Sequence, residues 1–456
     1  MSTRQAAQGP FLCVMLRKAL TLYGLTMIAV GSCIGSGIFV TPGQIAQAVP
    51  NAGLVLLVWA LGGILALTGA LTFSELGGMF PRSGGVYAYL REAYGDFAAF
   101  LYGWIILLVV NSGALAGLCS AFAEYLKTFF PHMSEQAKMG IAAATVLGLT
   151  AFNLLGVHVS QAIANLLTGL KLLAIGGIIA VGFLFGSTTQ TGLHFSLGEG
   201  VPDAWPTAML TALIGVVFSI GGWHHASYVA GEAIDAPRTV PRAMLLGVFI
   251  VLATYLLVNV AYMLLLPVAD IARTPRVASE ALERVVPWGG RAVAVAIALS
   301  IFGTVSIYTM SAPRIYFAMA ADGIFFGRLA NVHRHWRTPV LAMLVQAVWA
   351  VGVLVFFQGL FDRIITFVTF MDTFFMGLAG AAVFVFRRTR PQAERPIRVW
   401  GYPVVPAIFV LISLAFGINT LLQRPDQALP GLGLLGIGAM VFVFLKRNAR
   451  LRMVKK

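Results

Sequence analysis

The sequence predicts an all-α integral membrane protein with 12 transmembrane helices. Of its 456 residues, 59% are hydrophobic and only 11% are charged, whereas a soluble chain carries about 25% charged residues. Apolar runs of the length that crosses a bilayer as a helix, about 20 residues, follow one another along the whole chain. No soluble insert separates them, so we expect a single membrane domain.

Each expected span is an apolar run that ends at polar or turn-forming residues. The expected spans cover residues 21–48, 51–79, 96–126, 136–155, 159–186, 207–231, 240–266, 291–318, 339–357, 360–386, 403–422 and 430–445. Three connections have a recognisable character: a short interfacial helix over 86–94, a polar outer loop over 187–206 and an outer helix within 267–290.

The distribution of Lys and Arg predicts the orientation. With the N-terminus inside, 21 of these residues fall in inner segments and 8 in outer loops. Cytoplasmic loops carry the excess of positive charge in membrane proteins. We therefore expect residues 1–20 and a basic tail over 446–456 to be cytoplasmic. The net charge of +14 then reflects topology, so the expected partner is the lipid bilayer and not nucleic acid.

A glycine- and serine-rich segment, Gly31 to Gly37, interrupts the first span. Three glycines and two serines occupy its seven positions, and each glycine costs about 1 kcal/mol relative to alanine inside a helix. Unwound backbone is tolerated in a membrane only where it is buried in protein or lines a cavity. The N–H groups of Ser36 and Gly37 would begin a second half-helix, where the helix dipole favours an anion.

The sixth span repeats this design, because the pair Gly221-Gly222 and the polar residues after it interrupt an apolar run. Spans one and six correspond if the first ten spans are two five-helix halves, which an odd number of spans forces into opposite orientations. Paired breaks of this kind indicate an inverted-repeat transporter. The repeats would cover about 21–186 and 207–386, with two extra helices in 403–445. Close packing of unrelated helices through glycine is the alternative reading.

Five segments together resemble the amino acid–polyamine–organocation family, and within it the bacterial L-type amino-acid transporter branch. They are GSGIFVTPG, FSELGGMFPRSGGVYAYLREAYG, FSIGGWHHASYVAGE, SAPRIYFAMAADG and RPIRVWGYPVVP. The resemblance covers the first eleven spans. It implies a LeuT-type fold of five plus five inverted helices with helices 1 and 6 broken, alternating-access transport of amino acids, and a bacterial inner membrane.

The chain departs from the family at two positions and lacks one feature of its animal members. Val86 stands where the family often has an acidic residue, and His224 where it often has Asn, which leaves the substrate open. The outer loop 127–138 contains no cysteine, so we expect no disulfide-linked heavy subunit.

The resemblance also implies that the two breaks bind the carboxylate and the ammonium of an α-amino acid. It assigns substrate contacts to Ser32, Ile34, Gly35, Ser36 and Gly37 in the first break and to Phe218, Ser219 and Gly221 in the second. Asn111, in the third span, would line the pocket or form an interhelical hydrogen bond. His224 would contact the substrate or a gate, or serve only in helix packing.

Two charged residues lie deep in apolar spans. An intramembrane lysine costs about 2.5–3.5 kcal/mol on insertion scales and is a functional hypothesis by default; snorkelling to the surface is the alternative. In the resembling branch, a lysine at the place of Lys171 replaces a sodium ion and ties the first helix to the eighth. Its expected partners are carbonyls near Cys33 and the hydroxyls of Thr304 or Ser306.

The second charged residue, Asp372, lies in the middle of the tenth span. It would belong to a gate, a proton relay or an ion pair, and Trp223, beside the second break, to a gate.

These observations favour sodium-independent exchange of neutral L-amino acids. The alternatives are a proton-coupled symporter, with Lys171 or Asp372 titrating, and a cationic amino acid or polyamine antiporter, which the absence of a carboxylate beside the breaks disfavours. The three cysteines suggest neither a disulfide framework nor a metal site, and no nucleophile and base stand at a recognisable spacing. We therefore expect no enzyme activity, cofactor or metal.

Overall fold

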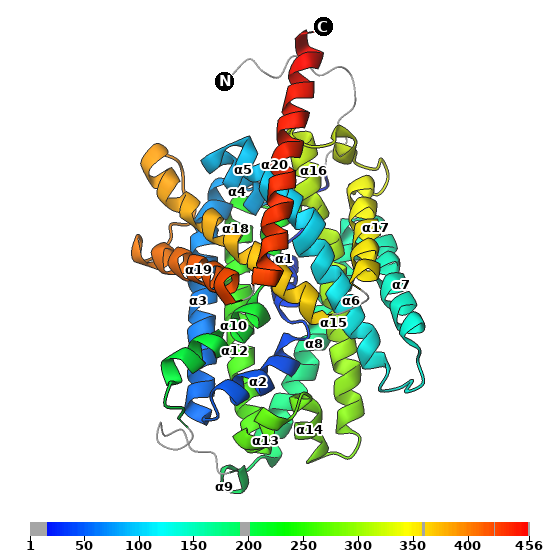
Figure 1. Ribbon diagram of the computed structural model, residues 1–456, viewed down its shortest axis with the longest axis vertical. Coiled ribbons are helices and arrows are strands. Elements are labelled where there is room, and N and C mark those ends of the chain that lie inside the picture. Colours follow the sequence, from blue (N-terminus) through cyan, green and yellow to red (C-terminus); the bar gives the residue numbers. More distant parts are fainter. Residues whose placement is uncertain (1–15, 192–200, 358–360, 424, 455–456) are drawn as a thin grey trace.

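The computed structural model describes residues 16–191, 201–357, 361–423 and 425–454, and this part of the chain is a bundle of helices (Figure 1). Ten of its helices are long and apolar enough to cross a membrane, and the bent pair of the first span is an eleventh. The predicted ninth span forms a helix of 17 residues, at the lower limit of length for a span. The all-α class is confirmed, whereas the number 12 is not established.

The long helices follow the expected spans closely. They are α1 (Leu22–Cys33), α2 (Gly37–Ala48), α3 (Ala52–Met79), α5 (Asp96–Ile105), α6 (Asn111–Leu126), α7 (Glu135–Leu154), α8 (Val157–Phe185), α10 (Trp205–Ile220), α12 (Ala236–Leu265), α15 (Gly289–Ser311), α16 (Pro313–Ala321), α17 (Val340–Phe356), α18 (Phe361–Thr389), α19 (Val404–Gln423) and α20 (Pro425–Val454).

Short helices form the connections. They are α4 (Val86–Tyr94), η1 (Ile106–Val110), α9 (Thr188–Thr191), α11 (His225–Tyr228), η2 (Ala230–Glu232), α13 (Val268–Arg273), α14 (Val277–Glu283) and η3 (Gly327–Ala330). The predicted interfacial helix is α4, with the same ends, and the predicted outer helix is the pair α13 and α14. Of the predicted polar loop 187–206, residues 192–200 lie outside the described part.

Side-chain caps fix where several spans begin. Thr21, Asn51 and Ser134 precede α1, α3 and α7, and each accepts a hydrogen bond from the backbone N–H three residues further on. Such caps satisfy one of the N–H groups that have no partner in the first turn of a helix.

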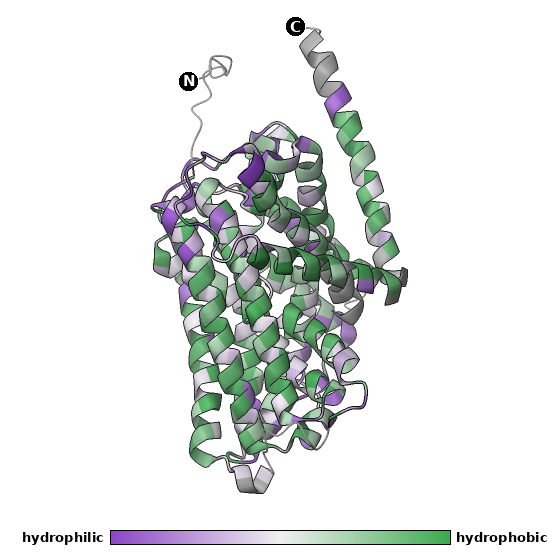
Figure 2. Cartoon of the chain, turned by 90° about the vertical axis from the view of Figure 1, so that its left-hand side faces the viewer, coloured by the Kyte–Doolittle hydropathy of each residue, from purple (hydrophilic) through white to green (hydrophobic). Residues whose placement is uncertain are grey.

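The two ends of the bundle carry different connections. The helices α4 and α16 and the last turns of α20 lie at one end, and α9, α13 and α14 lie at the other (Figure 1). Apolar residues dominate the middle and polar residues gather at the ends (Figure 2). The helix α20 continues to Val454, so the first residues of the expected basic tail belong to this helix. The sequence 446–454 has no Gly or Pro to end a helix, and basic residues near a C-terminus interact favourably with the helix dipole.

The first helix lies at the centre of the bundle. α1 packs against α8, α12 and α15, and nine of its twelve residues are buried. A helix enclosed on all sides can end in mid-membrane, because protein groups and not lipid surround its free backbone.

Candidate functional site

The first break separates α1 from α2 at an angle of 44°. The N–H groups of Ile34 and Gly35 are used locally, on the carbonyls of Val30 and Cys33, each at 2.9 Å. Ser36 is the residue before α2. The N–H groups of the first turn of a helix have no intrahelical partner, so the start of α2 provides the donors that the sequence predicts.

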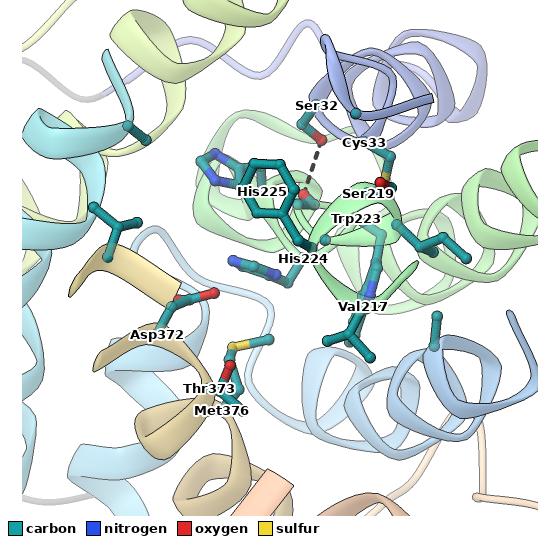
Figure 3. A pocket seen from close by; sticks show the side chains of 18 of the residues that line it. Ser32, Cys33, Val217, Ser219, Trp223, His224, His225, Asp372, Thr373 and Met376 are labelled. Atoms are coloured by element: carbon teal, nitrogen blue, oxygen red, sulfur yellow. Dashed lines mark hydrogen bonds between the residues drawn. The ribbon is translucent and has the colours of Figure 1, made fainter. Parts of the chain in front are cut away.

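The second break lies between α10 and α11. Gly222 adopts a φ of 107°, a left-handed conformation that favours glycine. A Cβ atom at Gly222 would lie 2.7 Å from the carbonyl oxygen of Ser32. The Ser32 hydroxyl lies 2.8 Å from the carbonyl oxygen of Gly222 (Figure 3). The two breaks are therefore in direct contact, and Ser32 joins them.

A cavity of about 190 Å³ lies against both breaks. Its wall comes from α3, α6, α10, α15, α18 and α19 as well as from the breaks. Twelve of the predicted site residues line it: Ser32, Gly35, Ser36, Gly37, Asn111, Phe218, Ser219, Gly221, Trp223, His224, Thr304 and Asp372. The fold thus brings both breaks and the tenth predicted span to one space.

The carbonyl end of α10 supplies acceptors to the cavity. The Phe218 carbonyl accepts a hydrogen bond from the N–H of Gly221 at 3.3 Å, and the Ser219 carbonyl accepts one from the Tyr255 hydroxyl at 3.1 Å. A carbonyl oxygen has two lone pairs, so each retains one for a ligand. Donors at the start of α2 and acceptors at the end of α10 match the two charged groups of an α-amino acid.

Gly37 allows the close approach of the two half-helices. A Cβ atom there would lie 2.7 Å from Ser219 Oγ, and Ser219 Oγ is in turn 2.9 Å from Thr41 Oγ1. Gly35 is different, because the nearest atom to a Cβ there, Thr304 Oγ1, is 3.7 Å away. Packing therefore requires a glycine at position 37 but not at position 35.

Lys171 lies in the interior of the bundle and is 1% exposed. Its ammonium nitrogen lies 2.8 Å from each of three oxygens, the carbonyls of Gly31 and Ile34 and the hydroxyl of Thr304. A lysine ammonium has three donors, so all of them are used and the side chain does not snorkel. Lys171 joins α8 to both α1 and α15.

Two residues complete the surroundings of Lys171. The Ser300 hydroxyl lies 3.1 Å from the Ile34 carbonyl. Gly303 leaves room for the lysine stem, because a Cβ atom there would lie 2.8 Å from Lys171 Cε. We call Lys171, Ser300 and Thr304, with the carbonyls that they contact, the lysine cluster.

Two predicted site residues lie apart from their expected partners. Ile34 is fully buried and is not among the residues that line the cavity, and its carbonyl accepts hydrogen bonds within the lysine cluster. Ser306 is not a partner of Lys171, because its hydroxyl accepts a hydrogen bond from Asn153 Nδ2 at 3.4 Å and the three donors of Lys171 are used elsewhere. Both differences arise because the sequence shows where a residue lies along a helix but not the direction in which its carbonyl or side chain points.

A short π-helix, η1, positions Asn111 at the cavity. It leaves carbonyls that side chains satisfy: Ser112 Oγ donates to Leu107 at 2.6 Å, and Trp349 Nε1 donates to Leu108 at 2.9 Å. Such π-bulges occur frequently at functional sites. Asn111 lines the cavity, and its Nδ2 lies 3.4 Å from the Tyr308 carbonyl.

Several functional residues escaped the sequence analysis. The Tyr255 hydroxyl lies 3.3 Å from the Cys33 carbonyl and also contacts the second break, so α12 holds the two breaks together. Gly303 and Ser300 stand one position and four positions before Thr304 on α15. In the sequence, the only indication of the role of Tyr255 is a polar hydroxyl group within an apolar span.

The two histidines of the second break differ in their contacts. His225 Nδ1 lies 2.7 Å from Ser311 Oγ, and its ring stacks on Tyr308 with centroids 4.1 Å apart. His224 is also buried, but its Nδ1 has no hydrogen-bond partner among the described residues. The same is true of the buried Oδ1 of Asp372.

Buried ion pairs close the end of the bundle where α4 lies. Arg314 on α16 pairs with Glu232 on η2 at 2.6 Å, and both side chains are fully buried. Glu75 on α3 pairs with Arg395 at 3.0 Å and with Arg387 at 2.7 Å. In the described ranges no three His, Cys, Asp or Glu side chains converge as a metal site requires.

The comparisons with known proteins agree with this geometry. Residues 20–439 match the model of the amino acid permease family. The chain is 29% identical over 434 residues to the b(0,+)-type amino acid transporter 1 of Homo sapiens, which covers 94% of this chain and 88% of that protein. It is 30% identical over 399 residues to the serine/threonine exchanger SteT of Bacillus subtilis (strain 168), which covers 87% of this chain and 89% of that protein.

A third relative is named for different substrates. The chain is 30% identical over 415 residues to the human cystine/glutamate transporter, which covers 90% of this chain and 82% of that protein. These relatives are amino acid transporters of almost the same length as this chain. With a family model that spans nearly all of its helices, this chain belongs to the amino acid permease family.

Proposed function

We propose that the protein is a sodium-independent exchanger of neutral L-amino acids. One observation carries the proposal: the N-terminus of α2 and the carbonyl end of α10 meet at one cavity. The first provides N–H donors for a carboxylate, and the second provides carbonyl acceptors for an ammonium. Relatives named as exchangers and amino acid transporters support this assignment.

The lysine cluster supports independence from sodium. In transporters with broken helices, unwound carbonyls coordinate the coupling Na⁺. Here the carbonyls of Gly31 and Ile34, at the end of α1, contact the ammonium of Lys171. The fixed positive charge takes the role that a sodium ion would have, so no ion needs to bind with the substrate.

Alternating access would use the two repeats proposed above, about 21–186 and 207–386. The ion pair of Arg314 with Glu232 and the ion pairs of Glu75 would form an inner gate that opens when the substrate is released. We propose a plasma membrane location, with both termini in the cytoplasm, from the excess of inner positive charge. The similarity to a bacterial exchanger supports a bacterial membrane.

We also propose that the protein works without a disulfide-linked second subunit and is not an enzyme. The outer loop 127–138 has no cysteine, and Cys33 and Cys119 are buried in the bundle. Cys13 lies outside the described residues. The named relatives are transporters, which supports a transport function and no chemical step.

Proteoliposomes test the exchange proposal. Uptake of a labelled neutral amino acid should require an unlabelled amino acid inside, and should be the same in sodium and in choline buffer. Uptake that proceeds into empty vesicles at the same rate, or that needs sodium, would contradict it.

A second candidate is proton-coupled symport on the same fold. The observation that favours it is the carboxyl group of Asp372, which lines the cavity and has a buried oxygen without a partner in the described part of the chain. An imposed pH gradient, acidic outside, would then drive accumulation into empty liposomes. An exchanger would show no accumulation under these conditions.

A further inference from the structure

The cavity is lined by two titratable side chains as well as by apolar ones. His224 approaches from the second break and Asp372 from α18, and both line the same cavity. Figure 3 shows the imidazole of His224 and the carboxyl group of Asp372 pointing toward one another across it. We call these two side chains the polar wall.

The polar wall is not satisfied by the protein. Neither Nδ1 of His224 nor Oδ1 of Asp372 has a hydrogen-bond partner among the described residues, although both atoms are buried. Most buried polar atoms in proteins have a partner, and a buried polar group without one is destabilising. The neighbouring histidine, His225, has its partner in Ser311, and among the residues that line the cavity only His224 and Asp372 have such an atom in the described part of the chain.

Much of the remaining cavity lining is apolar. Leu65 and Ala66 of α3, Phe409 and Ile412 of α19 and Val217 of α10 are among its lining residues. A side chain that leaves the backbone-binding breaks can therefore lie along an apolar surface while its polar end reaches the wall.

We infer that the polar wall of His224 and Asp372 is the side-chain subsite, and that it selects amino acids whose side chains carry an O–H or N–H donor. This inference rests on the proposed amino acid exchange and specifies its substrate class. Asp372 accepts the hydrogen bond from the ligand. His224 accepts or donates a second one, according to its tautomer.

An apolar side chain of equal size binds less well for a physical reason. It fills the same volume but leaves both polar atoms buried without a partner, and the loss of a partner for a buried polar group costs about 1–3 kcal/mol, which corresponds to roughly 5- to 150-fold in affinity. Discrimination is strong where a site is built to hydrogen-bond its substrate. Asp372 also provides a carboxylate in the same cavity as the two breaks, which the sequence analysis did not place there.

Competition in proteoliposomes tests the inference with two matched pairs of ligands. Threonine and valine have the same shape and differ by a hydroxyl donor. Lysine and norleucine share an unbranched aliphatic stem, and only lysine carries an ammonium. In the wild type, at least one donor-bearing member should inhibit exchange at a concentration about 10-fold lower than its partner.

Variants of Asp372 separate the two kinds of donor. Asp372→Leu should abolish either preference, because it removes the acceptor, and a thermal unfolding midpoint close to that of the wild type shows that the variant is folded. Asp372→Asn keeps an acceptor but loses the charge, so a threonine preference should survive and a lysine preference should disappear. His224→Phe changes the second residue of the polar wall, and it should reduce whichever ligand preference the wild type shows.

The control is Asn165→Leu on α8, which removes another side chain with a buried oxygen that has no partner in the described ranges but does not line the cavity. It should leave every ratio unchanged. Equal inhibition within both pairs in the wild type, or a preference that persists in both Asp372→Leu and His224→Phe, would overturn the inference while the exchange function stands. A wild type that exchanges no amino acid would instead refute the proposed function.

Discussion

Two groups of polar side chains lie in the membrane interior, and they differ in how completely their hydrogen bonds are satisfied. In the lysine cluster, the ammonium of Lys171 has three oxygen partners at 2.8 Å. In the polar wall, His224 and Asp372 each have a buried atom with no partner in the described part of the chain.

This difference distinguishes a structural contact from a binding surface. A saturated cluster gains nothing from a ligand, and its contacts join helices that must move relative to one another. An unsatisfied wall that lines a cavity gains a partner only when a ligand arrives. We therefore expect changes near the cavity to alter affinity, and changes in the lysine cluster to alter the rate of turnover.

The largest effect is expected on the cavity side, from Gly37→Leu. A Cβ atom at this position would lie 2.7 Å from Ser219 Oγ, so the start of α2 must move from the carboxylate position. Because overpacking costs roughly 1–3 kcal/mol, which corresponds to about 5- to 150-fold, we expect the large leucine side chain to lower substrate affinity by about 100-fold, as measured by equilibrium binding to purified protein. Gly176→Leu on α8, where nothing lies within 4 Å of a Cβ atom, is the matched control and should bind normally. Wild-type affinity in a folded Gly37→Leu variant would show that the start of α2 does not hold the substrate.

The next largest effect is expected in the lysine cluster. Lys171→Ala removes three charge-assisted hydrogen bonds, and such bonds are worth about 1.5–3 kcal/mol each. Only the part of this stabilisation that differs between the resting and the moving states affects the rate; a difference of one such bond, about 2 kcal/mol, would slow exchange by roughly 30-fold, while the dissociation constant of the substrate should change little. A ligand shifts a conformational equilibrium only through its differential interaction with the states, and the lysine contacts helices, not the ligand.

Lys171→Arg sharpens this prediction. It should not restore the rate, because a planar guanidinium does not fit where a compact ammonium is surrounded by carbonyls. Parallel measurements of exchange rate and binding in both variants decide the matter. Loss of affinity with an unchanged rate would reverse the roles of the two groups.

A smaller effect is expected from Gly303→Ala. The added methyl group would lie 2.8 Å from Lys171 Cε and 2.9 Å from Leu167 Cβ, so α15 and α8 must separate slightly or the lysine must shift. We expect exchange to slow by about 5- to 10-fold, in line with about 1 kcal/mol for a modest steric strain. Gly176→Ala on α8 is the control, because nothing lies within 4 Å of a Cβ there. Equal rates in the two variants would show that the lysine cluster tolerates displacement.

No effect is expected from replacing sodium by choline in exchange measurements. Lys171 already provides the positive charge between α1 and α15, so a sodium ion has no role at that place. Initial rates of exchange at matched ionic strength provide the measurement. Stimulation by sodium would indicate an ion site elsewhere and would remove the main argument for the role of the lysine.

The sequence alone determined the fold class, the positions of the spans and the two breaks. A helix that crosses a bilayer must be apolar over a fixed length, so the spans are visible as runs. Glycine and serine clusters such as Gly31 to Gly37 are visible too, because they disfavour a helix wherever they stand. The short helix over 86–94 was found with the same ends for a related reason, since glycines precede and follow it.

Only the tertiary structure decided which polar groups meet. The carbonyl of Ile34 faces Lys171 and not the cavity, and Ser306 faces Asn153, because the rotation of each helix about its own axis sets the direction of its groups. The contact of Tyr255 with both breaks depends on how α12 packs against α1 and α10. Asp372 and His224 are far apart in the sequence, and they form one wall only because α18 and the second break reach the same cavity. Apolar runs in the sequence indicate which segments cross the membrane, whereas the hydrogen-bond partners of a residue depend on how the helices pack.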